Sequence, residues 1–152
     1  MNFNYQKELV RIWENAVKLY HNGNTSADTF PIQHDLPFLN KIGLNKMDIF
    51  DYVEDWVREG TPDLGTFLLI HDLRRDFFIE EQKGIHSLEK LDSKALPGKT
   101  EELNGITWLP RVIGKARAKL RGELPSDTMF CCGGDRAFFG TNDIHPAEFL
   151  RI

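Results

Sequence analysis

The sequence has little of what several protein classes require. Its 152 residues include only two cysteines, Cys131 and Cys132, and these are adjacent, so they supply neither a disulfide framework nor a metal cage. No apolar run approaches the roughly 20 residues of a membrane span. The N-terminal residues also lack the apolar core of a secretory signal. These absences lead us to expect a cytoplasmic protein with no membrane partner.

Positive charge is also scarce. The 19 Lys and Arg residues are outnumbered by 23 Asp and Glu residues, which gives a formal net charge of −4. A general nucleic-acid binder needs a basic surface to displace counterions from phosphates, so nucleic acid is not an expected partner. GxSxG, HExxH, CxxC and phosphate-loop motifs are missing. Four of the five histidines have no partner at ligand spacing, so we expect neither a metal nor a cofactor.

The apolar residues that are present recur at helical spacing, which predicts an all-α protein with long loops. We expect helices over Tyr5–Tyr20, from Asn45 to Glu59, and over Pro62–Gln82, with a helical turn at Phe38–Ile42 and a last helix from His145. Asn45 and Asp48 resemble a capping box, and Thr61-Pro62 predicts the start of the third long helix. That helix is apolar on most of its circumference, so we expect it to be central.

Gly105–Gly122 is the stretch around which the chain is organised. Its helical pattern places one apolar stripe toward the core and basic residues on the remaining circumference, with Trp108 at the border. One interpretation is a solvated basic face. The other is an anion site built from Trp108, Arg111 and Lys115, with Asp135 orienting Arg111. By contrast, 123–143 is predicted to be a long loop with an extended Met129–Cys132 segment and flexible Gly133-Gly134.

Two charged residues lie within the apolar third helix. His71 and Arg74 fall on its apolar side, and an unpaired buried charge costs several kcal/mol. They are therefore either structural, paired with Asp35, Asp76 or Asp135, or part of a pocket wall in which His71 serves as acid or base. A similar choice applies to Cys131 and Cys132. Their apolar neighbours favour a buried, inert thiol over a nucleophile.

The sequence also contains an internal similarity that indicates a repeat. Phe30 and Asp35 recur 100 positions later as Phe130 and Asp135. We predict one compact domain, 1–152, made of two related helix–loop–helix halves, about 5–82 and about 101–152, joined by a linker of about 83–100, in which Leu88 and Leu91 indicate a short helix. Chance similarity among common residues is the alternative.

The segments GITWLPRVIGKARAKLRG, FCCGGDRAFF and IHPAEFL carry a family resemblance over roughly Leu96 to the end of the chain. Together they resemble the uncharacterised bacterial proteins grouped as domain of unknown function 5069. The resemblance implies a small, mostly helical bacterial domain and no particular activity. At Gly114 the family pattern leads us to expect an acidic residue instead.

The sequence therefore predicts a cytoplasmic helical domain that binds a small anionic ligand. The candidate binding residues are Trp108, Arg111, Lys115, Asp135, His71 and Arg74. An enzyme acting on a small anionic substrate and a protein-interaction adaptor are the alternatives. A titratable group with a strongly shifted pKa beside the ligand would distinguish an enzyme from a binding protein.

Overall fold

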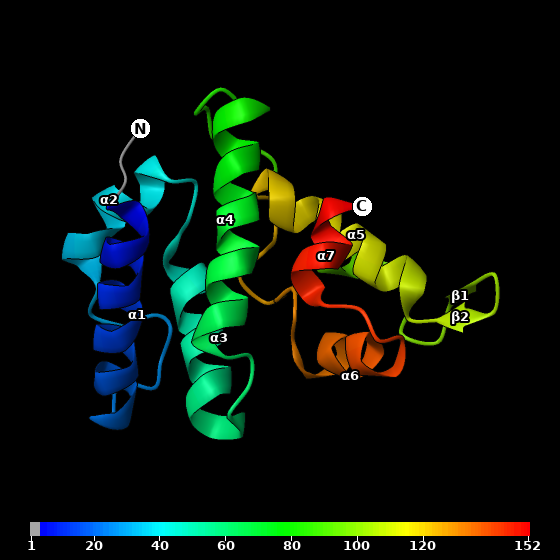
Figure 1. Cartoon of the computed structure of the whole chain (residues 1–152), viewed down its shortest axis with the longest axis horizontal. Helices are drawn as coiled ribbons and strands as arrows, with labels where there is room; N and C mark the ends of the chain where they lie inside the picture. The colour runs from blue at the N-terminus through cyan, green and yellow to red at the C-terminus, as the bar shows by residue number, and fades with distance from the viewer. Residues whose placement is uncertain (1–3) are drawn as a thin grey trace.

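The computed structural model describes residues 4–152 and is mostly helical, which confirms the predicted all-α class (Figure 1). Its α-helices are α1 (Tyr5–His21), α2 (Leu36–Lys41), α3 (Lys46–Glu59), α4 (Leu64–Glu80), α5 (Leu109–Arg121), α6 (Gly133–Thr141) and α7 (Pro146–Arg151). Short 3-10 turns occupy Gln33–Asp35 and Ser93–Ala95.

A two-stranded hairpin, which was not predicted, precedes α5. Strand β1 (Glu102–Leu103) pairs antiparallel with β2 (Ile106–Thr107), and Leu103 lies opposite Ile106. The connecting Asn104-Gly105 has φ angles of 52° and 78°. A two-residue hairpin turn with positive φ at both positions favours this dipeptide. The local turn signal was therefore visible in the sequence, although the strands themselves are only two residues long.

Helix α3 begins and ends as the sequence predicts. The Asp48 backbone N–H donates to Asn45 Oδ1 at 3.2 Å, and the Asn45 N–H donates to Asp48 Oδ2 at 2.8 Å, which completes the capping box. Gly60 ends the helix in the left-handed region, with φ of 73°. The next helix starts later than expected. Asp63, rather than Thr61, caps α4, because Asp63 Oδ1 accepts from the Thr66 N–H at 2.9 Å.

The largest error in the predicted elements concerns residues 123–143. Gly133-Gly134 was expected to be flexible loop, yet it forms the first turn of α6. A Cβ at Gly134 would come within 2.5 Å of Trp108 Cζ2, so the glycine permits close packing of α6 on the Trp108 ring. Tertiary packing here outweighs the low helix propensity of two glycines. The short helix expected at Leu88 and Leu91 is not formed.

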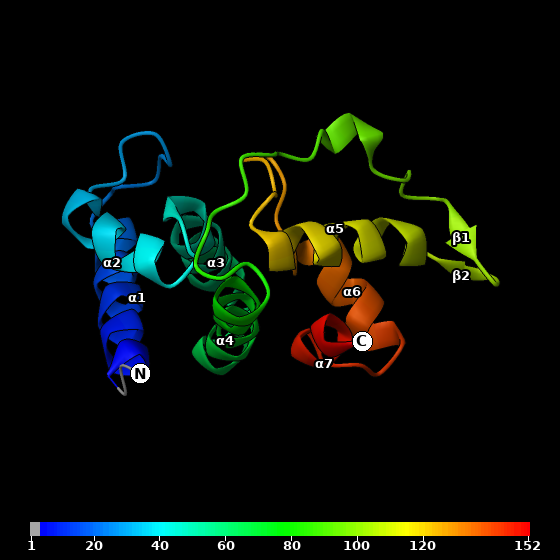
Figure 2. The same ribbon diagram turned by 90° about the horizontal axis from the view of Figure 1, so that it is seen from above.

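The helices form two groups on either side of α4 (Figures 1 and 2). Helix α1 packs against α3, whereas α5 and α7 pack against α4. One cluster of buried apolar residues runs through both groups, from Leu9 on α1 to Leu150 on α7. Helix α4 therefore has the central position expected from its apolar circumference.

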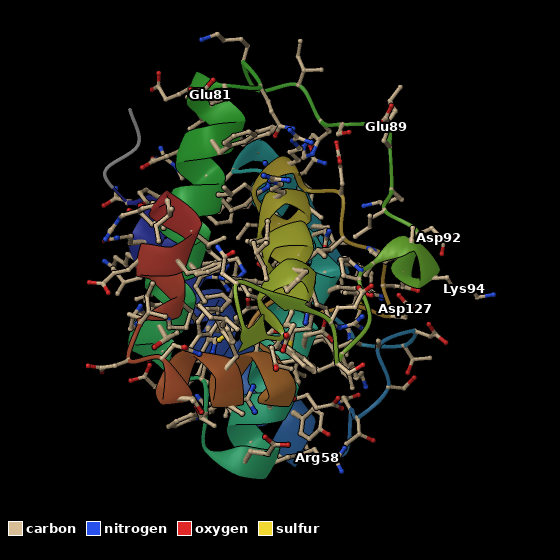
Figure 3. All side chains as sticks on the ribbon, turned by 90° about the vertical axis from the view of Figure 1, so that its right-hand side faces the viewer. Arg58, Glu81, Glu89, Asp92, Lys94 and Asp127 are labelled. Carbon is tan, nitrogen blue, oxygen red and sulfur yellow. The ribbon has the colours of Figure 1, made fainter. Side chains whose placement is uncertain are left out.

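The segment predicted to be a linker runs beside the loop that follows α5 (Figure 2). The Leu91 N–H donates to the Glu123 carbonyl at 2.8 Å, and Ser93 Oγ donates to Asp127 Oδ2 at 3.0 Å. Asp92 and Lys94 stand at the outer edge of the molecule on the same side as Asp127 (Figure 3). Leu96 turns inward and is 8% exposed. A Cβ at Gly114 would come within 2.9 Å of Leu96 Cδ2, so the acidic residue expected at position 114 would require the Leu96 side chain to shift.

The two groups show the same order of local structure. The turn after α2 has a Leu44 N–H to Leu39 carbonyl bond of 2.8 Å, and the turn after α6 has an Ile144 N–H to Phe139 carbonyl bond of 3.1 Å. The residue before each bonded N–H has positive φ in both turns, 83° at Gly43 and 50° at Asp143. The relation between the two halves stays a prediction.

Candidate functional site

Lys115 on α5 is buried against the start of α6. Its Nζ lies 2.6 Å from Asp135 Oδ2 and 3.2 Å from Cys132 Sγ. Asp135 Oδ1 accepts from Trp108 Nε1 at 2.8 Å, and Asp135 Oδ2 also accepts from the Cys131 N–H at 2.9 Å. Both carboxylate oxygens therefore have donors. This satisfied network holds α5 and α6 together and offers no free carboxylate oxygen to a ligand.

The fold assembles only part of the predicted anion site. Trp108, Lys115 and Asp135 come together, but Arg111 is not oriented by Asp135, so that part of the prediction is wrong. Arg111 Nη1 donates to the Pro97 carbonyl at 3.0 Å, and the guanidinium carbon stands 5.8 Å from the Trp108 ring centroid. Lys115, one turn farther along α5, takes the carboxylate instead. Ligand binding at these residues stays a prediction.

Lys119 is the second buried lysine of α5, so the interpretation of these basic residues as a solvated face is wrong for both lysines. Its Nζ lies 2.6 Å from Asp48 Oδ1 and 2.9 Å from His71 Nε2. His71 Nδ1 faces the Phe67 carbonyl at 2.7 Å and must carry the ring proton to bond there. We therefore assign His71 as the neutral tautomer that accepts from Lys119 through Nε2.

The electrostatics agree with this assignment. Burial, reinforced by the Lys119 ammonium, lowers the pKa of His71 to about 3. Burial is the largest single effect on the pKa of Asp48 and would raise it, but the neighbouring charges, the Lys119 ammonium first among them, and the hydrogen bonds from Lys119 and the Asn45 backbone together lower it. The partner predicted for His71 was Asp35, Asp76 or Asp135, and this was wrong, because the carboxylate is Asp48. Both His71 nitrogens are occupied, which leaves this imidazole structural.

Arg74 is buried, at 2% exposure, but its predicted carboxylate partner is wrong. Its Nε donates to the Gly43 carbonyl at 2.9 Å, and its Nη1 donates to the Leu120 carbonyl and to Gln82 Oε1, both at 2.6 Å. Both carbonyls belong to positions where a helix has just ended or is ending. Arg74 thus joins the ends of α2 and α5 to α4, and its planar fork suits several acceptors at once.

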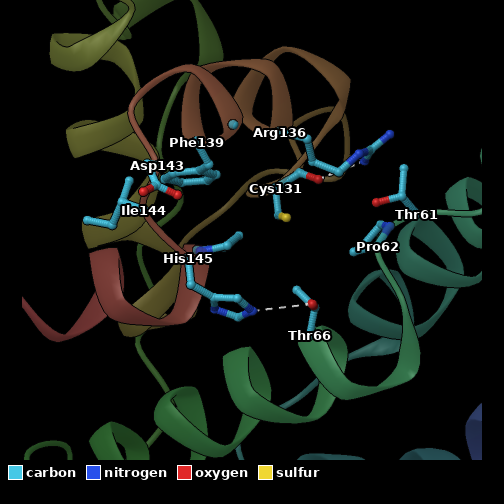
Figure 4. A pocket seen from close by; sticks show the side chains of 11 residues that line it. Thr61, Pro62, Thr66, Cys131, Arg136, Phe139, Asp143, Ile144 and His145 are labelled. Carbon is cyan, nitrogen blue, oxygen red and sulfur yellow. Dashed lines mark hydrogen bonds between the residues drawn. The ribbon is translucent and has the colours of Figure 1, made fainter.

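A cavity of about 380 Å³ lies between the start of α4 and the α6–α7 pair (Figure 4). It falls within the size range of small-molecule sites. Its lining residues come from four segments of the chain and include both polar and apolar side chains. They are Thr61, Pro62, Thr66, Cys131, Arg136, Phe139, Gly140, Asp143, Ile144, His145 and Pro146.

The histidine of this cavity has a defined hydrogen-bonding role. His145 caps α7, because its Nδ1 accepts from the Ala147 N–H at 3.0 Å. In the neutral ring the proton is then on Nε2, which faces Thr66 Oγ1 at 3.4 Å (Figure 4). The imidazole N–H and the Thr66 hydroxyl thus form a pair of polar groups on one wall of the cavity.

The charged side chains of Arg136 and Asp143 line the cavity, and they differ in whether they have partners of opposite charge. Arg136 Nη1 donates to Asp55 Oδ2 and to the Cys131 carbonyl, both at 2.8 Å, and Nη2 contacts Glu59. Asp143 has no ion-pair or hydrogen-bond partner for its carboxylate among residues 4–152. The surroundings are therefore net negative, in contrast to the cationic site that the sequence suggested.

Cys131 places its thiol at the inner end of the cavity (Figure 4). Its residue is fully buried, and burial raises the pKa of the thiol to about 12. A protonated thiol is a poor nucleophile at neutral pH. The buried thiol agrees with the interpretation favoured by its apolar sequence neighbours. Cys132 is only partly buried and contacts Lys115 as described above.

Of the residues that line this cavity, the sequence pointed to Cys131 alone as a candidate for chemistry. Thr66, Arg136 and Asp143 drew no attention, and His145 was recognised only as the start of a helix. No linear motif connects them, since Thr66 and His145 are 79 positions apart. The one available signal was His145-Pro146, which predicted a helix N-terminus and hence an ordered imidazole.

Comparison with protein-family models, with curated proteins and with solved structures yielded no match. The resemblance to domain of unknown function 5069 therefore remains a prediction. Across residues 4–152, no group of three or more His, Cys, Asp or Glu side chains is arranged to hold a metal ion. No helix of that same range has the length and apolar character to cross a membrane.

Proposed function

We propose that this protein binds a small organic molecule in the cavity between α4 and the α6–α7 pair. The observation that carries the proposal is the combination of volume and lining. A space of about 380 Å³ has apolar walls and a few convergent polar groups, which is the usual composition of a ligand site. It also lies between the first and second halves of the chain, where such sites are frequent.

This proposal moves the ligand away from the residues that the sequence favoured. Lys115 and Asp135 satisfy each other in the interior, and His71 and Arg74 are occupied by Lys119 and by carbonyl groups. Binding is favoured over nucleophilic catalysis because the pKa of Cys131 is raised to about 12 by burial. The expected cytoplasmic setting belongs to the same proposal, and both cysteines are free thiols, as is usual in a reducing compartment.

The experiment uses Gly140, which lines the cavity within α6. A Cβ there meets no atom within 4 Å, so Gly140→Leu places a side chain in the open space without a collision at its base. Gly65→Leu is the matched control, because Gly65 is also an exposed helical glycine and does not line the cavity. Both variants gain helix propensity.

The measurement is a thermal-shift screen of small polar fragments against the three proteins. We expect some fragments to raise the melting temperature of wild type and of Gly65→Leu but not of Gly140→Leu. At a ligand concentration of 100 Kd, binding stabilises the folded state by about 2.7 kcal/mol, which such a screen detects. A library without any stabilising fragment, or fragments that act equally on all three proteins, would show that the cavity binds nothing.

We further infer that the two halves are copies of one helical unit. Support comes from the shared order of helices, the matching turns after α2 and α6, and the burial of both Asp35 and Asp135. A superposition of residues 9–50 on residues 108–150 tests the idea. Phe30 must fall on Phe130 with the helices in the same directions, and opposed helix directions would refute it.

A further inference from the structure

We propose that the ligand of this cavity is a small zwitterion with an apolar body, of the chemical class of an apolar α-amino acid. This inference rests on the proposed function and specifies its ligand. The polar groups of the cavity are of two kinds. One wall offers a hydroxyl group as hydrogen-bond donor, and the other lining residues include a carboxylate that has no partner among residues 4–152.

The donor wall consists of His145 and Thr66. Because His145 Nδ1 accepts from the Ala147 N–H, its Nε2 carries a proton in the neutral ring and points at Thr66 Oγ1. When Thr66 Oγ1 accepts a hydrogen bond from this N–H, the hydrogen of the Thr66 hydroxyl is free to point to a ligand. A carboxylate or another strong acceptor is the group that such a hydroxyl binds best.

The carboxylate is Asp143, in the turn between α6 and α7. It is exposed, it lines the cavity, and none of residues 4–152 pairs with it. Within the described part of the chain, Arg136 is the one lining side chain with a permanent positive charge, and it is paired with Asp55 and Glu59. The charge that the cavity leaves uncompensated is therefore negative, which favours an ammonium group on the ligand.

The body of the ligand follows from the remaining walls. Pro62, Phe139, Ile144 and Pro146 line the cavity with apolar surface. An aliphatic or aromatic side chain of a few carbon atoms buries against these residues. A free anion gains little in this place, because Asp143 repels it and the Arg136 charge is already compensated.

Three probes that share a phenyl group test the contributions of the ammonium and carboxylate charges one at a time. They are L-phenylalanine (zwitterion), 2-phenylethylamine (ammonium only) and 3-phenylpropionate (carboxylate only). Dissociation constants are measured by calorimetry or ligand-observed NMR. We expect L-phenylalanine to bind most tightly and 3-phenylpropionate most weakly.

Two variants separate the contacts. Asp143→Asn keeps a residue type that tolerates positive φ and removes only the charge. It should weaken L-phenylalanine and 2-phenylethylamine by about two- to fivefold, since an exposed ion pair contributes modestly. Thr66→Val should weaken L-phenylalanine and 3-phenylpropionate and leave 2-phenylethylamine unchanged. Asp28→Asn is the control: it removes an exposed negative charge from a residue that does not line the cavity. It should change none of the three dissociation constants.

The outcomes distinguish this inference from the proposed function. If 3-phenylpropionate binds most tightly, if no probe binds, or if Asp143→Asn has no effect, the zwitterion assignment is wrong. The cavity still stands as a ligand site if other fragments lose binding in Gly140→Leu. If Gly140→Leu leaves every bound compound unaffected, both the site and its ligand class are refuted.

Discussion

Lys119 on α5 and Asp48 on α3 form a largely buried ion pair, with 2.6 Å between Nζ and Oδ1, although 71 positions separate them in the chain. Asp48 also completes the capping box of α3, and Lys119 also donates to His71 on α4. One ammonium group therefore joins three helices. Lys115, one turn earlier, joins α5 to α6 in the same way. Lys119 therefore ties α5 to α3 and α4 of the first half, and Lys115 ties it to α6 within the second half.

Removing the Lys119 charge should be strongly destabilising. We expect Lys119→Met to lower the free energy of unfolding by about 3 kcal/mol, because the largely buried Asp48 carboxylate loses its cation. Arg117→Met is the control, since Arg117 lies exposed on the same helix and should change stability by less than about 0.5 kcal/mol. Denaturant unfolding measures both. Equal effects of the two variants would contradict a structural ion pair.

Stability should fall with decreasing pH because of His71. Burial lowers the pKa of His71 to about 3 in the folded protein, from the ordinary histidine value of 6.5. Between these values the unfolded chain binds a proton that the folded protein does not, so stability is complete above pH 6.5 and is lost as pH falls toward 3. His71→Gln should flatten this part of the curve of unfolding free energy against pH. An unchanged slope would mean that another group is responsible.

Asp51 should act in the opposite direction. Burial raises its pKa to about 7, so the folded protein holds a proton that the unfolded chain releases above about pH 4. This contribution to stability is present at pH 4 and is lost as pH rises to 7. Asp51→Asn should therefore stabilise the protein at pH 8 by about 1–2 kcal/mol and have little effect at pH 4, after allowance for solvent at this partly exposed position. Thermal unfolding at both pH values gives the comparison, and a stabilisation equal at both would refute it.

The stability of the fold should depend on the planar shape of the Arg74 guanidinium as well as on its charge. We expect Arg74→Ala to lower the melting temperature clearly, with a loss of about 2–4 kcal/mol, because the Gly43 and Leu120 carbonyls lose their donor. Arg74→Lys should fail to restore stability, since an ammonium lacks the planar fork that reaches three acceptors. Full rescue by lysine would show that only the charge matters.

Arg111 tests the anion site that the sequence favoured. Its guanidinium stands over Trp108 and donates to the Pro97 carbonyl, so an anion bound there would meet one half-buried cation beside an aromatic ring. In a thermal-shift screen of small anions, binding at this site requires that wild type responds and that Arg111→Ala does not. Because Asp135 already neutralises the charge of Lys115, we expect small anions to change the melting temperatures of both proteins equally. If an anion stabilises wild type but not Arg111→Ala, the anion site predicted from the sequence is supported instead.

Much of the fold could be predicted because it depends on local chemistry. The apolar period of α1, the Asn45–Asp48 capping box and Gly60 after α3 act between residues close in sequence. The buried Arg74 was also predictable, since a cation within an apolar helix has few other places to lie. The helix α6 was not predictable in this way, because Gly133 and Gly134 disfavour a helix until Trp108 packs on it.

The sequence by itself determined the helical class, most helix positions and the burial of His71 and Arg74, since spacing and capping are properties of short segments. Only the tertiary structure decided which charges meet. It paired Lys119 with Asp48 and Lys115 with Asp135, and it placed the Asp143 carboxylate at the cavity with no partner from the described residues, 4–152. The physical reason is that a long lysine on an amphipathic helix can reach either water or a distant carboxylate. That choice depends on which helices pack around it.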